Sequence, residues 1–491
     1  MRVFLALLCW ASLPARAYNS GRNTKYCVRT LAGGLGNGTA GFADGLGAAS
    51  GIDLRGVSLR AAPTSVALFR QPSGIAIDGL GRFALVADYK NHVLRRLDLD
   101  PINGGAVGAP LVTTLAGLAG VPSDYSTMVG AATVEHRGSA DGVGAAARFN
   151  HPSAIAIAPA SAGSWALVTE YYNHAVRRVD LASAAVTTVA GVGGFFSSGT
   201  ADGVGKAARF NHPAGVALDA TGAFAVVADF YNHAVRRLAV GTWRVTTLAG
   251  RKGAPGSADG TGGAARFYHP WGIAAAAGYA VLTDYKNHAV RRVDFGSGRV
   301  TTLAGSLAAG EHPVPGQPDP GAGAADSAKD DDNESSGRTA RFWYPSAIAL
   351  HLADEYALVA DRHNHVLRRM SLRPPHKVRT IAGKAGAWGY ADGVGGVARF
   401  EHPAGVATNS RQAYALVGDS RNNALRKLEL TACRWSASPT PAPAIVFFSQ
   451  GQEPSPAPVP TPLSSAPAAV AAGGAPAALS GLLSLGLLLA Q

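Results

Sequence analysis

The sequence predicts an all-β protein: a six-bladed β-propeller of four-stranded antiparallel blades, closed by an N-terminal outer strand that joins the last blade. The first observation is a unit of four short apolar runs, uninterrupted between residues 210 and 250, in which Gly, Asp, Asn or Thr separates each run from the next. This pattern is typical of short strands joined by turns. The second observation is that the unit recurs along the chain. Because a lone meander buries only one face, repeated meanders favour a ring in which each sheet covers its neighbour.

Two landmarks place the blades. The segment Asp-x-x-Asn-His-x-x-Arg-Arg, or a close variant, marks the step from the second strand to the third, and begins at Asp88, Glu170, Asp229, Asp284, Asp361 and Asp419. A proline opens each inner strand, at Pro72, Pro152, Pro213, Pro270, Pro345 and Pro403. Only five outer runs follow a third strand, and a sixth, VRTLAG at residues 28–33, precedes the first blade. We therefore expect the first strand of the mature chain to complete the last blade.

These residues resemble the NHL-repeat propellers, a family named for its Asn-His pair. The pair is present as Asn91-His92, Asn173-His174, Asn232-His233, Asn287-His288 and Asn364-His365. The linker ADGxGxxARFxHP, as in residues 201–213, extends the resemblance over roughly residues 28–430. The resemblance implies the propeller fold but no single activity, because such propellers are interaction platforms in most settings and enzymes in a few.

The linker before each inner strand carries an Ala-Asp-Gly triplet in most blades. Its aspartates are Asp44, Asp141, Asp202, Asp259 and Asp392. One carboxylate per linker is too few for a calcium loop, so we expect turn-forming or capping aspartates. Longer unrepeated segments over residues 49–64, 118–137 and 306–338 are candidate ligand loops, and equally fit decoration that plays no part in binding.

The N-terminus and the cysteines indicate export. Residues 1–17 have an early Arg, an apolar run and a small-x-small end, as in a secretory signal peptide. Removing Cys9 with that segment leaves Cys27 and Cys433. When both ends of the chain are aligned with the unbroken third blade, Cys27 and Cys433 fall at the turn that joins its third strand to its outer strand. We therefore expect a disulfide between them that closes the ring. Two unpaired thiols are the alternative.

The remaining segments predict a surface protein. The propeller is expected over residues 18–434, a Pro/Ala/Ser-rich stalk over 435–467, and an apolar tail over 468–491 that matches a GPI signal. A freely secreted protein with a frayed apolar C-terminus is the alternative. Sequons at Asn37 and Asn333 predict N-glycosylation in exposed linkers.

The formal net charge of +12 does not indicate nucleic acid. Each third strand carries a basic pair, such as Arg236-Arg237, so the charge is spread around the ring and not gathered in a patch. One member of each pair is expected to meet the blade's own carboxylate or backbone carbonyls. With the export signal, this argues against a nucleic-acid partner and leaves a diffuse attraction for acidic glycans open.

Histidines are the most notable candidates for a site. His151, His212, His269 and His402 each precede the proline that opens an inner strand, so they should ring one mouth of the central channel. A zinc site is one interpretation, but a feature repeated in nearly every blade is more typical of scaffold. We therefore predict structural histidines, no metal and no cofactor.

Breaks in the repeat are weak pointers to a ligand. They are Glu170, where other blades have Asp, Trp271 beside the inner-strand proline, and Asn422-Asn423 in place of Asn-His. Trp271 would stack on a sugar ring or pack on the next blade.

The resulting prediction is an extracellular, surface-tethered scaffold that binds a protein or a glycan. The sequence contains no GxSxG elbow, HExxH motif or P-loop, so no catalytic residue is assigned. The alternative is a metal-dependent lyase or lactonase-type hydrolase with its site at the channel mouth.

Overall fold

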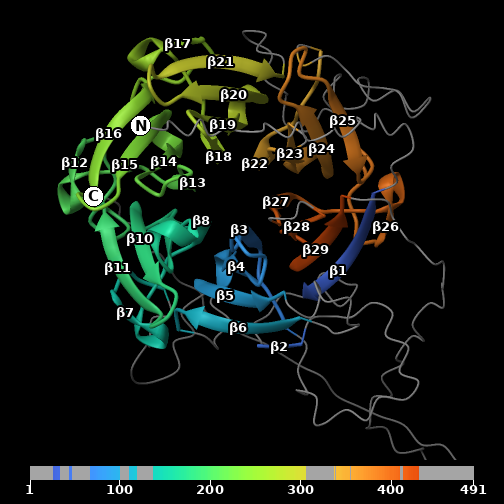
Figure 1. The fold of residues 1–491 in the computed structure, drawn as a ribbon, viewed down its shortest axis with the longest axis horizontal. Coiled ribbons are helices and arrows are strands. Elements are labelled where there is room, and N and C mark those ends of the chain that lie inside the picture. Colours follow the sequence, from blue (N-terminus) through green and yellow to red (C-terminus); the bar gives the residue numbers. More distant parts are fainter. Residues whose placement is uncertain are drawn as a thin grey trace, which may run out of the picture. The chain divides into compact units, whose positions relative to one another are not determined.

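The computed structural model describes residues 26–33, 44–46, 67–99, 110–118, 137–305, 337, 339–353, 355–409 and 413–430. These residues form six antiparallel sheets around a central channel, which confirms the all-β six-bladed propeller (Figure 1). Residues 1–17, the stalk, the tail, Asn37, Asn333 and Cys433 lie outside the described residues.

The strands of the first three blades follow one pattern. Blade 1 consists of β3 (Pro72–Ile77), β4 (Phe83–Asp88), β5 (Val93–Asp98) and β6 (Leu111–Ala116), with β2 (Gly45–Leu46) outside them. Blade 2 consists of β8 (Pro152–Ile157), β9 (Trp165–Glu170), β10 (Ala175–Asp180) and β11 (Ala185–Ala190), with β7 (Gly142–Val143). Blade 3 consists of β13 (Pro213–Leu218), β14 (Phe224–Asp229), β15 (Ala234–Ala239) and β16 (Arg244–Gly250), with β12 (Gly203–Val204).

Blades 4 to 6 repeat this pattern, except that the described residues of blade 5 add no two-residue strand outside its outer strand. Blade 4 consists of β18 (Pro270–Ala276), β19 (Tyr279–Asp284), β20 (Ala289–Asp294) and β21 (Arg299–Ala304), with β17 (Gly260–Thr261). Blade 5 consists of β22 (Pro345–His351), β23 (Tyr356–Asp361), β24 (Val366–Ser371) and β25 (Val378–Ala382). Blade 6 consists of β27 (Pro403–Thr408), β28 (Tyr414–Asp419), β29 (Ala424–Glu429) and β1 (Cys27–Gly33), with β26 (Gly393–Val394).

Short 3-10 helices connect these strands. Those after the second strands are η1 (Tyr89–Asn91), η5 (Phe230–Asn232), η7 (Tyr285–Asn287) and η8 (Arg362–Asn364). Those in linkers and turns are η2 (Gly144–Ala146), η3 (Ala160–Ala162), η4 (Gly205–Ala207), η6 (Gly262–Ala264) and η9 (Gly395–Val397). Within the ranges that the structure describes, no helix has the length and hydropathy to cross a membrane.

The four predicted strands are present in every blade, and five blades carry one more. In five blades the linker that enters the blade adds a two-residue strand outside the outer strand, as where Gly203 pairs with Val245. Two residues are too short for an alternating pattern, so the sequence carried no periodic signal for this strand. The added strand fixes the linker along the outer edge of the blade.

The second strands are buried on both faces, because each sheet is packed between two others. Every residue of β4, β9, β23 and β28 is buried. In one core cluster, Val226 and Ala228 of blade 3 pack with Ile273 and Leu282 of blade 4. Burial on both sides explains why these strands read as continuous apolar runs.

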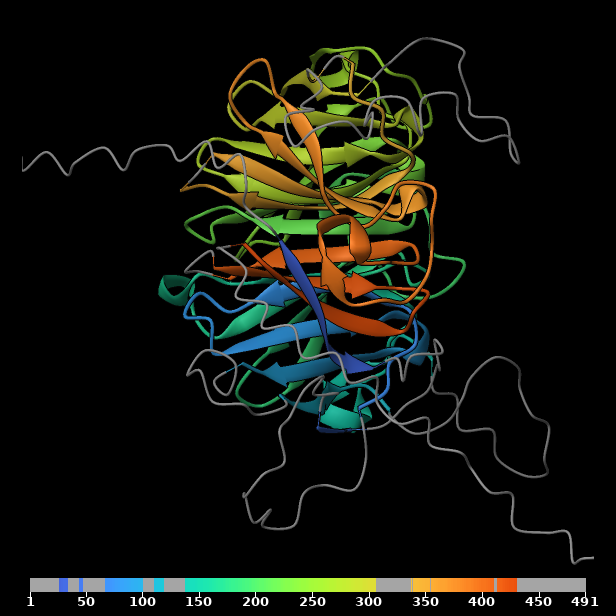
Figure 2. The same ribbon diagram turned by 90° about the vertical axis from the view of Figure 1, so that its right-hand side faces the viewer.

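The inner strands meet in a closed circle. Each of β3, β8, β13, β18, β22 and β27 contacts the next, and β27 contacts β3. The first strand, β1, lies antiparallel to β29, with Val28 opposite Leu428 (Figures 1 and 2). Cys27 is buried at the start of β1. The bridge from Cys27 to Cys433 stays a prediction, since Cys433 is outside the described residues.

Candidate binding site at the channel mouth

One end of every sheet carries the same two landmarks. The proline that opens the inner strand pairs with the acidic residue that ends the second strand, as Pro213 does with Asp229. The turns after the second strand and the residues before the proline therefore lie at this end, which we call the mouth. The opposite end of the sheets is called the lower face.

A buried arginine joins two carboxylates in blade 3. Asp229 accepts hydrogen bonds from the Asn211 amide at 2.8 Å and from Arg236 at 2.6 Å. Arg236 also donates to Asp202 of the linker, at 2.7 Å. The side chains of Arg236 and Asp229 are fully buried. We call this trio the brace, and in this blade it confirms that one arginine of the basic pair meets its own blade's carboxylate.

The same brace occurs in four other blades. The sets are Arg95 with Asp88 and Asp44, Arg177 with Glu170 and Asp141, Arg291 with Asp284 and Asp259, and Arg426 with Asp419 and Asp392. Burial raises the pKa of Asp88, Asp284 and Asp419 to about 6, although the paired arginines act to lower it.

The linker aspartates therefore do more than form turns. Asp202 accepts hydrogen bonds from the amide and the hydroxyl of Thr247, at 3.2 and 3.0 Å, besides its ion pair with Arg236. It ties the linker to the outer strand and to the buried arginine. Sequence gave no sign of this role, because the partners are separated by more than thirty residues.

Glu170 lies in the brace of blade 2. Its carboxylate accepts from the Asn150 amide and the Asn173 side chain, both at 2.9 Å, and from Arg177 at 2.7 Å. The side chain has no exposed surface, and burial raises its pKa. Its position is that of a structural carboxylate. In blade 6 the side-chain Nδ2 of Asn422 donates the corresponding hydrogen bond to Asp419, at 2.8 Å.

The histidines of the Asn-His pairs link neighbouring blades. His174 Nδ1 accepts a hydrogen bond from the His212 amide at 3.1 Å, and His365 Nδ1 accepts from the His402 amide at 3.2 Å. The remaining bonds of this type join His92 to His151, His233 to His269, and His288 to Tyr344. In the last junction, Asn423 Oδ1 accepts from the Gln71 amide at 2.9 Å.

The predicted histidines before the prolines surround the mouth. The rings of His151, His212, His269 and His402 are half-buried and contact aromatic or histidine rings of the turns. Burial lowers the pKa of His151 and His269 to about 3, of His212 to about 4 and of His402 to about 2. All four are neutral at pH 7. No group of three or more His, Cys, Asp or Glu side chains suited to a metal ion occurs in the described part of the chain.

The two variable residues after each second strand lie at the mouth, where Tyr171 and Phe230 are buried members of a small apolar cluster. The first of them is aromatic in four consecutive blades, as Tyr89, Tyr171, Phe230 and Tyr285. Trp271 lies among these rings, with centroid separations of 5.0 Å to Phe230, 5.2 Å to Tyr285 and 5.8 Å to Tyr171. We call these five residues the aromatic mouth.

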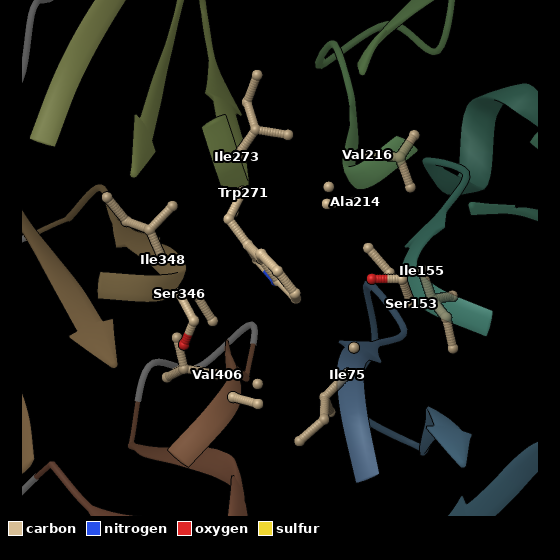
Figure 3. Close-up of a pocket in the computed structure, with 17 residues that line it drawn as sticks. Ile75, Ser153, Ile155, Ala214, Val216, Trp271, Ile273, Ser346, Ile348 and Val406 are labelled. Carbon is tan, nitrogen blue, oxygen red and sulfur yellow. The ribbon is translucent and has the colours of Figure 1, made fainter. Parts of the chain in front are cut away.

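Trp271 points from β18 across the channel, while the other inner strands present smaller side chains (Figure 3). The channel contains a cavity of about 70 Å³, lined by apolar residues such as Ile75 and Val406 and by polar groups in similar proportion, Ser153 among them. The inner strands approach closely: a Cβ on Gly215 would lie 2.2 Å from the Trp271 carbonyl oxygen. The narrow channel leaves the half-exposed Trp271 ring at its mouth.

Blades 5 and 6 interrupt the aromatic mouth with polar groups. Arg362 and His363 occupy the two variable positions in blade 5, and Ser420 and Arg421 occupy them in blade 6. The Arg362 guanidinium carbon lies 5.6 Å from the centroid of the Trp271 ring. The sequence analysis did not single out these positions, although their variation between the repeated acidic residue and the repeated Asn was a usable signal.

Comparisons with known proteins agree with the repeat. No family model matches the chain. NHL repeat-containing protein 2 is 32% identical over 156 residues in Bos taurus, covering 30% of this chain and 21% of that protein. The Homo sapiens protein of that name is 30% identical over 165 residues, covering 32% and 22%. Protein SUPPRESSOR OF QUENCHING 1, chloroplastic, of Arabidopsis thaliana is 27% identical over 282 residues, covering 47% and 26%. The chain thus matches about a quarter of the length of these relatives.

Solved structures share the fold. A structural genomics protein of unknown function from Bacteroides thetaiotaomicron has a TM-score of 0.54 at 17% identity, covering 83% of this chain and 76% of that one. An auxiliary nutrient binding protein from the same organism has a TM-score of 0.52 at 15% identity, with coverage of 83% and 76%. At these identities the likeness is one of fold.

Proposed function

This chain is an NHL-repeat β-propeller, and we propose that it is an extracellular, surface-tethered scaffold that binds a protein or a glycan at its mouth. The aromatic mouth is the observation that carries the proposal. Positions that hold the blades together are repeated around the ring, whereas the aromatic residues gather on one side of it. Such an unrepeated surface on a repeated frame is the usual place for ligand contacts.

Exposed aromatic residues near the mouth support a binding role. Phe195 and Phe196 are 58% and 95% exposed, and Trp388 is 68% exposed. Phe195 stacks on Tyr172 of the mouth turns at 5.9 Å, and its carbonyl bonds with His174 Nε2 at 3.0 Å. Large apolar side chains presented to solvent on a fixed loop are typical of interaction surfaces.

An array experiment tests the proposal. The purified protein is applied to immobilised glycans and to cell-surface proteins, and each hit is remeasured with Trp271→Ala. We expect a ligand whose affinity falls at least tenfold in this variant, about 1.4 kcal/mol. Trp243→Ala is the control, because Trp243 lies in the β15–β16 connection at the lower face. A ligand bound equally by both variants would place the binding surface elsewhere.

A further inference from the structure

We propose that the blade 5 side of the mouth binds an acidic saccharide, with Arg362 holding a carboxylate or sulfate group and Trp271 packing against the sugar ring. The inference rests on the proposed function and narrows it to one ligand chemistry. The Arg362 cation, the Trp271 ring and unpaired polar atoms lie on this side of the mouth.

Arg362 differs from the buried arginines of the braces. Each brace arginine has two carboxylate partners, whereas Arg362 forms no ion pair among the described residues. Its buried Nε has no hydrogen-bond partner among the described residues, which is also true of brace arginines such as Arg236, so the missing carboxylates are what set Arg362 apart. A half-buried guanidinium without a counter-ion favours a ligand that brings one, and its planar fork matches a carboxylate or sulfate.

Other polar atoms beside Arg362 lack partners as well. Within the described ranges, Trp343 Nε1 and His402 Nδ1 are buried without a hydrogen bond. The His363 ring connects the two residues, at 5.4 Å from Trp343 and 4.8 Å from His402 between centroids. His269 Nδ1 of blade 4 also lacks a partner within these ranges, whereas His212 Nδ1 in blade 3 bonds with Asn211 at 2.7 Å. Unsatisfied buried groups carry a cost that a polar ligand removes by bonding to them.

The local charge favours an anion. The twelve variable turn positions of the mouth hold Lys90, Lys286, Arg362 and Arg421 and no Asp or Glu. The nearby carboxylates are Glu401, 3.8 Å from Arg421, and the fully buried Asp361 and Asp419 that precede these turns. Burial and the nearby Arg362 charge lower the pKa of His363 to about 3, so this histidine is neutral at pH 7.

The aromatic residues favour a sugar over an acidic peptide. A pyranose has one face of C–H bonds, which packs on a flat aromatic ring, and hydroxyls at its edge, which bond to tyrosine and histidine. The half-buried Trp271 ring packs against Tyr285 and Tyr171 at interplanar angles of 33° and 32°, which fixes its orientation at the mouth. The Tyr285 hydroxyl lies 3.4 Å from His363 Nε2, next to the cation. A charged sugar meets both features at once.

Binding of defined polymers tests the inference. Calorimetry or biosensor titration of the purified protein uses heparin, polygalacturonate, neutral dextran and poly-glutamate. We expect binding to heparin, to polygalacturonate or to both, and at least tenfold weaker binding to dextran and poly-glutamate. Tighter binding of heparin would identify sulfate as the group that Arg362 holds. Tighter binding of polygalacturonate would identify carboxylate as that group. Equal binding of poly-glutamate would overturn the inference, since charge alone would then explain the affinity.

Matched variants locate the site. Arg362→Ser installs the residue that blade 6 carries at Ser420, and we expect at least a tenfold loss of affinity for the acidic saccharide. Arg299→Ser removes the same charge from an exposed position at the lower face and should change affinity less than twofold. Equal losses in the two variants would mean diffuse attraction and would overturn the site. If Arg362→Ser does not fold, Arg362→Lys is used, since it keeps the positive charge but lacks the planar guanidinium. Unchanged affinity of the Arg362→Lys variant would count against bidentate binding of the anion.

The outcomes separate this inference from the proposed function. A neutral glycan or a protein that binds through Trp271 and ignores Arg362→Ser would leave the scaffold standing and refute the acidic saccharide. Absence of any ligand sensitive to Trp271→Ala would refute both.

Discussion

Asn423 Oδ1 accepts a hydrogen bond from the Gln71 amide, 2.9 Å away, although the two residues are 352 positions apart in sequence. This contact joins blade 6 to blade 1. In the other five junctions a histidine Nδ1 is the acceptor, and all six acceptor residues have φ between 52° and 59°. Asn and His are among the side chains that tolerate this left-handed conformation. Two departures from the repeat, Gln71 and Asn423, therefore meet at one junction.

Replacing Asn423 should weaken that junction. Asn423→Ala leaves the Gln71 amide without its acceptor, which is expected to lower the free energy of unfolding by roughly 1–3 kcal/mol. Urea denaturation measures the change. Asn423→His is the matched control, because it installs the acceptor found in the other blades and should retain most of the stability. Equal loss in the two variants would contradict the role of the acceptor.

The two arginines of one third strand should differ sharply in their contribution to stability. Arg236→Met removes the cation between Asp229 and Asp202, and leaving a buried carboxylate unpaired costs roughly 3–5 kcal/mol. Arg237→Met removes a half-buried side chain that lies 3.8 Å over Phe224, which is worth about 1 kcal/mol. Chemical denaturation of the two variants gives the comparison, and similar losses would argue against the brace.

His365 should make stability depend on pH. Burial, then the nearby Arg421 charge, lowers its pKa to about 4 from 6.5. The unfolded chain binds the proton first, so this contribution to stability is complete above pH 6.5 and is lost as pH falls towards 4. Thermal unfolding between pH 4 and pH 7 measures the slope. Other buried histidines contribute to the same slope, so His365→Asn, which mirrors Asn423, should make it less steep by the share of one proton, and an unchanged slope would mean that His365 does not titrate on unfolding.

The predicted Cys27–Cys433 bridge should stabilise the ring. In the chain-entropy model a bridge across so long a loop contributes up to roughly 5 kcal/mol. Peptide mapping without reductant should recover the linked pair, and Cys27→Ser/Cys433→Ser should unfold at lower denaturant concentration. Recovery of two free thiols from the native protein would refute the bridge.

The tail predicts a lipid anchor. Phospholipase that cuts GPI anchors should release the protein from the surface of cells that produce it. A chain that ends at residue 467 serves as control and should appear in the medium without the enzyme. Surface protein that resists the phospholipase would exclude this anchor.

Local sequence determined the blades. Four apolar runs with turn residues between them specify strands, and the inner-strand prolines and the repeated Asp mark where they begin and end, because these features act over a few residues. The pairing of one arginine with its own Asp also followed, since the two are seven positions apart in each blade. The two-residue outermost strands did not follow, because they are too short to show a period.

Only the tertiary structure decided what the mouth contains. The repeat separates Trp271 from Arg362 by ninety-one positions, and their proximity comes from the packing of neighbouring blades at one end of the ring. The same packing buried Glu170, which in sequence stood out from the repeat, and left Tyr89 and Arg362 at the mouth. A repeat specifies each blade by local turns and apolar runs, whereas a surface made by several blades depends on which residues their stacking covers and which it leaves exposed.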